Sequence, residues 1–143
     1  MNDRYLHRAK RIDNGEWAEG YLIADEQNEE KCFIGYVFGT NDDGTPHDFD
    51  VVAVDPSTIC QCTGKTDIEK NLIFEHDAVS FLDATSTEYG YSEHWQVGEV
   101  LWDDETASFQ VTERLLAESY EVLEDCKVLG NTIDNPELLE VGG

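Results

Sequence analysis

Cysteine and histidine are the side chains of this 143-residue chain best suited to bind a metal, and there are four of each. Cys60 and Cys62 are separated by one residue, whereas paired cysteines of structural zinc sites usually have roughly two to four residues between them. A site built from Cys60, Cys62, Cys126 and His76 is an alternative, but the spacing favours reduced thiols packed as small apolar side chains. We expect no metal and no cofactor.

Carboxylates are the second source of chemistry, because the chain has 32 acidic residues. Metal-dependent nucleases combine an Asp with a Glu-x-Lys strand, and Asp13 together with Glu29, Glu30 and Lys31 has that composition. In so acidic a chain such a match arises easily by chance. Glycoside hydrolysis by two carboxylates stays open for the same reason, since the separation that defines it is not visible in a sequence.

Other catalytic motifs are incomplete. Gly64, Lys65 and Thr66 resemble the end of a phosphate-binding loop, but Ile59 stands where that motif requires glycine. There is no G-x-S-x-G motif for a serine nucleophile. His76 and His94 lie far apart in the sequence, and each is more typical of a turn or surface residue than of a base. The sequence therefore favours a binding protein over an enzyme.

The net charge of −23 argues against a basic nucleic-acid-binding surface and for a partner protein with a basic surface. The candidate contact residues lie at the tips of two expected loops, and they are Asp42, Asp43, Asp103, Asp104 and Glu105. A simpler explanation of the charge alone is solubility and protection against edge-to-edge strand pairing.

Two further functions remain as alternatives. A small-ligand pocket could form at the mouth of a β-barrel, lined by Trp95, Trp102, Tyr89 or Tyr91. Aromatic residues at strand spacing more often belong to a core, so this pocket ranks below protein binding. Exposed strand edges would also permit a homo-oligomeric structural component, which the sequence does not rank.

The first element that must position these residues is a hairpin, since Asn14-Gly15 separates two strand-like runs at about residues 4–12 and 16–24. With a two-residue turn, Arg8 would face Tyr21 and Lys10 would face Glu19. The basic residues of this hairpin then have local partners.

Further strands are expected at residues 32–38, 49–55, 57–62, 72–81, 95–103, 106–112 and 127–133. A short helix is expected within Glu113–Leu123, where Leu116, Tyr120 and Leu123 follow helical spacing, and a helical turn after Asn135. We expect an all-β, mainly antiparallel, barrel-like fold with one or two short helices near the C-terminus. It would be a single domain over residues 1–143, with an N-terminal β lobe of about 1–64 and a C-terminal barrel-like lobe of 71–143.

No apolar segment reaches the length of a membrane span, and no signal peptide follows the basic residues near the N-terminus. We therefore expect a cytoplasmic protein.

Five segments of the chain, in their order and spacing, resemble the YopX family of bacteriophage and prophage proteins. They are RAKRIDNGEWAEGYLI from Arg8, QCTG from Gln61 with Asp67, IFEHDAVSF from Ile73, GEVLWD from Gly98 and VLGNTIDNPELL from Val128. The family usually has glycine where this chain has His76. A positive φ at that position would therefore cost more conformational energy here than with glycine. The resemblance implies an all-β fold and a phage origin, and it implies no established activity. With a phage origin, the expected partner is a host or phage protein.

Overall fold

The computed structural model describes residues 5–113, 119–121 and 125–139. Its regular structure consists of antiparallel strands and two short 3-10 helices, which confirms the expected fold class. The chain divides into two compact units, the N-terminal unit Met1–Cys62 and the C-terminal unit Thr63–Gly143. That the whole chain forms one domain stays a prediction. No described helix is long and apolar enough to cross a membrane.

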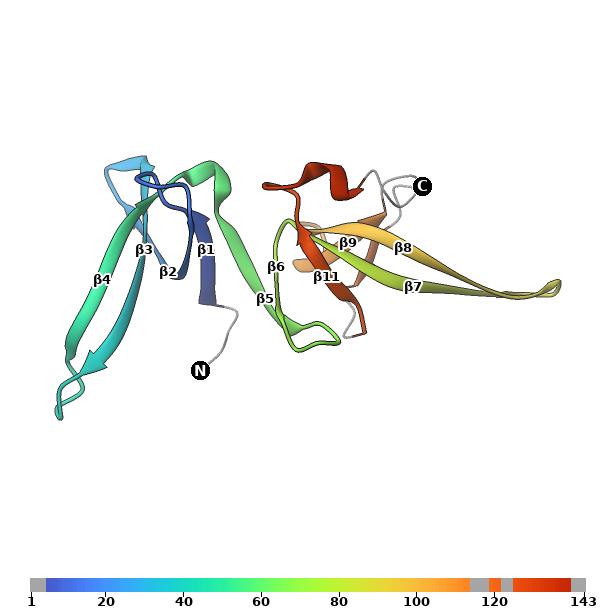
Figure 1. Cartoon of the computed structure of the whole chain (residues 1–143), viewed down its shortest axis with the longest axis horizontal. Coiled ribbons are helices and arrows are strands. Elements are labelled where there is room, and N and C mark those ends of the chain that lie inside the picture. The colour runs from blue at the N-terminus through green and yellow to red at the C-terminus, as the bar shows by residue number, and fades with distance from the viewer. Residues whose placement is uncertain (1–4, 114–118, 122–124, 140–143) are drawn as a thin grey trace. The chain divides into compact units, whose positions relative to one another are not determined.

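Figure 1 labels the elements in chain order. The first half contains β1 (Leu6–Lys10), β2 (Trp17–Asp25), β3 (Asn28–Thr40), β4 (Pro46–Val54), η2 (Pro56–Thr58) and β5 (Cys60–Thr66). The second half contains β6 (Leu72–Phe74), β7 (Asp77–Thr87), β8 (Gly90–Asp103), β9 (Ser108–Glu113), β10 (Ser119–Glu121), β11 (Lys127–Asn131) and η3 (Pro136–Leu139).

The sheet of the N-terminal unit curls into a half-barrel. Its strands follow the order β4-β3-β2-β1-β5. At one end of β4, Val54 forms a bridge with Arg11, and the Ile12 N–H donates to the Ala53 carbonyl at 3.1 Å. The curl encloses a small core of Ala9, Cys32, Ile34 and Val54. One face of β3 and β4 is therefore buried at the root of their hairpin.

The β1–β2 hairpin is confirmed, but its expected register is wrong by two residues. Arg8 lies opposite Glu19, and Lys10 lies opposite Trp17. The turn is longer than two residues because the Gly15 N–H donates to the Arg11 carbonyl and the Arg11 N–H to the Glu16 carbonyl. The cations of Arg8 and Lys10 both lie over the Trp17 ring, at 5.2 and 5.5 Å. These basic residues thus have local partners, as expected.

The second sheet has the order β10-β9-β8-β7-β11 and belongs to the C-terminal unit. Its core contains Ile73, Val79, Phe81, Val100, Val111 and Cys126. The expected helix at Glu113–Leu123 is wrong at the described positions, because β9 ends at Glu113 and residues 119–121 form β10. The rest of that range lies outside the described residues. The terminal helical turn is confirmed as η3.

A buried carboxylate holds the turn before β6 against β11. Asp67 is 3% exposed and accepts hydrogen bonds from the backbone N–H groups of Glu69, Asn71 and Val128, at 2.9, 2.8 and 3.0 Å. Burial raises its pKa, but the hydrogen bonds outweigh this, led by the one from Val128, so its pKa lies below the ordinary value. The ionised carboxylate therefore stabilises the C-terminal unit.

Replacing Asp67 with Asn should lower the free energy of unfolding at neutral pH by about 2–3 kcal/mol, because one acceptor oxygen and the charge are lost to buried donors. Folding lowers the Asp67 pKa, so the contribution is present above its unfolded pKa of about 3.9 and is lost as pH falls through the folded value. Urea unfolding of both proteins at several pH values measures this. A difference that does not shrink in acid would contradict it, and Glu69→Gln is the exposed control.

Candidate binding site

The outer face of β2, β3 and β4 in the N-terminal unit carries exposed apolar side chains. Gly35 lies opposite Tyr21 on one side and Val51 on the other, and Val37 lies opposite Phe49. Side chains alternate along a strand, so these positions share one face, opposite to the core residue Ile34. This outer face is defined by Tyr21, Ile23, Gly35, Val37, Phe49 and Val51.

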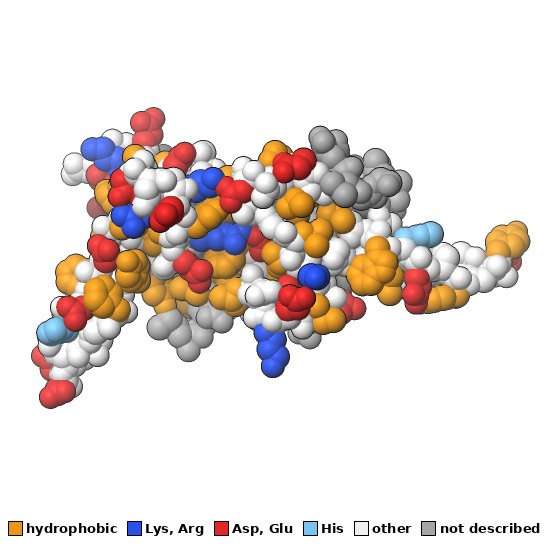
Figure 2. Space-filling model, in the orientation of Figure 1, with side chains coloured by type: hydrophobic (Ala, Val, Ile, Leu, Met, Phe, Trp, Pro, Cys, Tyr) orange, Lys and Arg blue, Asp and Glu red, His pale blue; other side chains and the backbone are white. Residues whose placement is uncertain are grey.

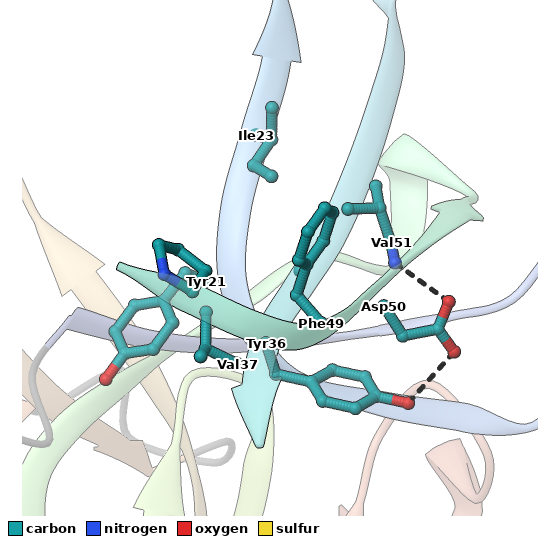
Figure 3. A pocket seen from close by; sticks show the side chains of 9 residues that line it. Tyr21, Ile23, Tyr36, Val37, Phe49, Asp50 and Val51 are labelled. Atoms are coloured by element: carbon teal, nitrogen blue, oxygen red, sulfur yellow. Dashed lines mark hydrogen bonds between the residues drawn. The ribbon is translucent and has the colours of Figure 1, made fainter. Parts of the chain in front are cut away.

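A hollow of about 360 Å³ lies on the outer face, and Gly35, which has no side chain, is one of the residues that line it. Figure 3 shows the side chains around the hollow. A Cβ atom there would come within 2.8 Å of Ile23 Cδ1. Three residues around the hollow have large exposed fractions: Val37 51%, Phe49 62% and Val51 46%. Exposed apolar side chains that gather in this way are typical of a protein-binding surface.

Acidic residues lie beside the apolar ones on the edge strand. In β4, Asp48 and Asp50 alternate with Phe49 and Val51 and so point to the opposite face. The Asp50 carboxylate accepts from the Tyr36 hydroxyl at 3.3 Å and from the Val51 N–H at 2.9 Å, as the dashed lines in Figure 3 show. Figure 2 shows hydrophobic side chains along the stem of the β3–β4 hairpin and acidic ones toward its tip.

Four of the predicted contact residues, Asp42, Asp43, Asp104 and Glu105, lie in turns, and Asp103 ends β8 beside the second turn. Several of their side chains form hydrogen bonds within these turns. Asp43 accepts from the N–H and hydroxyl of Thr45, at 3.0 and 2.6 Å, and its pKa is lowered by these hydrogen bonds, the hydroxyl first. Asp103 accepts from the Glu105 N–H at 3.0 Å, and Asp104 from the Trp102 indole at 2.7 Å. Asp42 and Glu105 are exposed. The two tips belong to different units.

The four aromatic residues expected to line a pocket lie on or beside the β7–β8 hairpin, and none of them lines the hollow at Gly35. Tyr89, Tyr91 and Trp95 are exposed. Trp102 packs edge-on against Phe109, with ring centroids 5.1 Å apart. The sequence did not identify the outer face, although a glycine inside a strand, such as Gly35, is a known sign of a close approach.

Among the candidate nuclease residues, Asp13 is bound by a neighbouring arginine. The Asp13 carboxylate forms a two-bond ion pair with Arg11, at 3.0 and 2.8 Å, and the hydrogen bond from Arg11 holds its pKa below the usual range. Glu30 and Lys31 are exposed. The Glu29 side chain lies outside the described residues.

All four cysteines are buried. Desolvation by burial, followed by the negative charge of Asp67, raises the pKa of Cys126 to about 11. Within the described ranges, no group of three or more His, Cys, Asp or Glu side chains is arranged to hold a metal ion. Cys60 and Cys62 lie in one unit, and Cys126 and His76 lie in the other.

His76 takes part in a partly buried polar cluster. It has a φ of 70°, and its Nδ1 lies 3.0 Å from Oε2 of Glu99. The Thr132 hydroxyl donates to the same oxygen at 2.8 Å, and its N–H donates to the His76 carbonyl. The hydrogen bond with His76 is the largest cause that lowers the pKa of Glu99. The carboxylate lies between imidazole and hydroxyl, so the imidazole is not placed to activate Thr132 as a nucleophile.

Replacing His76 with Gly should raise the Glu99 pKa, because burial still disfavours the carboxylate while its main hydrogen bond is gone. The Glu99 pKa is lowered in the folded chain, so its stabilisation is present above the unfolded pKa and is lost as pH falls through the folded value. Carboxyl ¹³C NMR through an acid titration measures the shift. An unchanged Glu99 pKa would show that the pair is not coupled, and Thr132→Val should raise the pKa less.

The thiols should resist alkylation in the folded chain at pH 8, because all four are buried and the Cys126 thiol is protonated there. Counting the labelled cysteines by mass spectrometry after maleimide treatment tests this. We expect none labelled in buffer and four in denaturant. Rapid labelling of Cys126 in buffer would contradict the expectation.

The family comparison covers nearly all of this structure. The YopX family, described as "YopX protein", matches residues 6–140. That range includes the β1–β2 hairpin, the turn at His76 and the β11–η3 segment, which contain three of the five segments that resemble the family. A search of curated proteins finds no match to the chain. The chain belongs to the YopX family.

Proposed function

We propose that this phage-type chain is a non-enzymatic acidic interaction protein that binds a host or phage protein through the outer face of its N-terminal unit. The observation that carries the proposal is the group of exposed apolar side chains around Gly35. Sheet faces in soluble proteins usually present polar side chains to water, so an apolar one favours a partner. The bacterial host cytoplasm, where thiols stay reduced, is the proposed location.

The negative charge of the β3–β4 hairpin supports a partner with a basic surface. Residues 32–54, which include most of β3 and all of β4, contain Asp42, Asp43, Asp48 and Asp50 and neither lysine nor arginine. Opposite charge around an apolar centre accelerates association and excludes acidic competitors, while the apolar contacts supply most of the affinity. Asp42 and Asp43, the loop-tip carboxylates of the N-terminal unit, then belong to the rim of the interface.

A tagged capture from host lysate at low and high salt tests the proposal. We expect one protein at near-stoichiometric amount, less of it at high salt, and at least about a tenfold loss in a Val37→Ser, Phe49→Ser double variant. The matched control is Tyr91→Ser with Trp95→Ser, which removes from the C-terminal unit two side chains at least as exposed as Val37 and Phe49.

Two results would contradict the proposal. One is capture that survives in the Val37, Phe49 double variant, and the other is no capture beyond that of an unrelated protein of similar charge. Circular dichroism of each variant shows that the fold is retained. A saturable thermal shift with a metabolite or nucleotide, lost in the same double variant, would assign the hollow to a small ligand instead.

A further inference from the structure

On the side of β4 that faces away from β3, described residues pair with only one end of the strand. β4 is the terminal strand of its sheet, and the described strands pair with it on the β3 side (Figure 1). On the other side, Val54 bridges to Arg11, and the Ala53 carbonyl accepts from Ile12. No described strand pairs with residues 46–52 on this side of β4. An unpaired edge of this kind can accept a further strand.

The contact at Ala53 indicates which backbone groups face the open side. In an antiparallel strand the N–H and C=O of one residue point the same way, and residues two apart repeat that direction. The Ala53 carbonyl faces away from β3, so the N–H and C=O groups of Val51 and Phe49 do so too. The Val51 N–H donates to the Asp50 carboxylate, which covers the edge at this point.

The side chains along the edge define what an added strand would meet. Phe49 and Val51 lie on the outer face beside the hollow, whereas Asp48 and Asp50 point to the other face. An added strand alternates in the same way, with every second side chain on each face. Its apolar residues would contact Phe49 and Val51, and the residues between them would lie beside the two carboxylates.

We propose that the β4 edge binds an extended segment of the partner protein in which apolar residues alternate with lysine or arginine. This inference rests on the proposed function and names the chemistry of its partner. A carbonyl of the partner replaces the Asp50 carboxylate at the Val51 N–H, and the carboxylate then pairs with a cation of the segment. A second copy of this chain fits poorly, because its β4 would bring Asp48 and Asp50 against like charges.

A labelled peptide with blocked ends, Lys-Val-Arg-Ile-Lys-Val-Arg-Ile, tests the inference by fluorescence anisotropy with the full chain. The control peptide has the same residues with all four cations first, so it has equal charge without alternation. We expect saturable binding of the alternating peptide, weaker at high salt, and about tenfold weaker binding of the control. Equal binding of the two peptides would overturn the inference.

Variants of the edge give a second test. Phe49→Pro removes the outward N–H together with the ring, and Phe49→Ala removes the ring alone, so the proline variant should bind the alternating peptide about tenfold more weakly than the alanine variant. Asp48→Asn with Asp50→Asn should weaken binding about fivefold, and the charge-matched control Glu88→Gln with Glu137→Gln, at two exposed positions of the C-terminal unit, should not. Equal affinities of the proline and alanine variants would overturn strand addition.

The lysate capture separates this inference from the proposed function. A partner that is lost in the Val37, Phe49 double variant but captured equally by Phe49→Pro and Phe49→Ala uses the outer face without adding a strand, so the proposed function stands and the inference falls. Peptide binding with no captured partner overturns the proposed function. Light scattering that finds a dimer of the parent, abolished by Phe49→Pro, assigns the edge to a second copy and overturns the inference.

Discussion

Each unit depends on a small core at the root of a hairpin that extends beyond it. In the N-terminal unit the buried apolar group is Ala9, Cys32, Ile34 and Val54, while β3 continues to Thr40. In the C-terminal unit Phe81 and Val100 are buried at the root of a hairpin whose Tyr91 and Trp95 are exposed. A two-stranded ribbon is only marginally stable alone, so cross-strand pairs such as Val37 with Phe49 have to support the extended part.

The carboxylates of the chain have more than one role. Asp67 is buried and links a turn to β11, Glu99 is held by His76 and Thr132, and Asp43 and Asp103 shape turns. These residues would be retained in a neutral protein of the same fold. The net charge of −23 therefore has more than one origin. Solubility explains only those carboxylates that make no local contact.

Local patterns predicted the strands well, and non-local geometry was harder to predict. A run rich in β-branched and aromatic residues located β3, alternation of residues located β8, and Asn14-Gly15 located the first hairpin. The register of that hairpin was missed because Arg11 pairs with Glu16 around a longer turn. Leucine and tyrosine at helical spacing suggested a helix where Glu113 and residues 119–121 are in strands. The outer face was missed because Cys32–Phe38 has the composition of a strand buried on both faces, and no sequence pattern shows which face lacks a covering layer.

Beyond the core, β4 has polar side chains on the face that is buried at the root of the hairpin and apolar side chains on the opposite face. Val52 and Val54 point to the face that is buried at the root, as in an ordinary half-buried strand. Asp48 and Asp50 continue that face toward the tip, and Phe49 and Val51 lie on the other face, which is exposed. A selection for solubility alone would accept the aspartates but would replace the exposed apolar residues with polar ones. This arrangement suits pairing of the β4 edge with a strand in which apolar and cationic residues alternate. The apolar face of the added strand then meets Phe49 and Val51, and its cationic face meets Asp48 and Asp50.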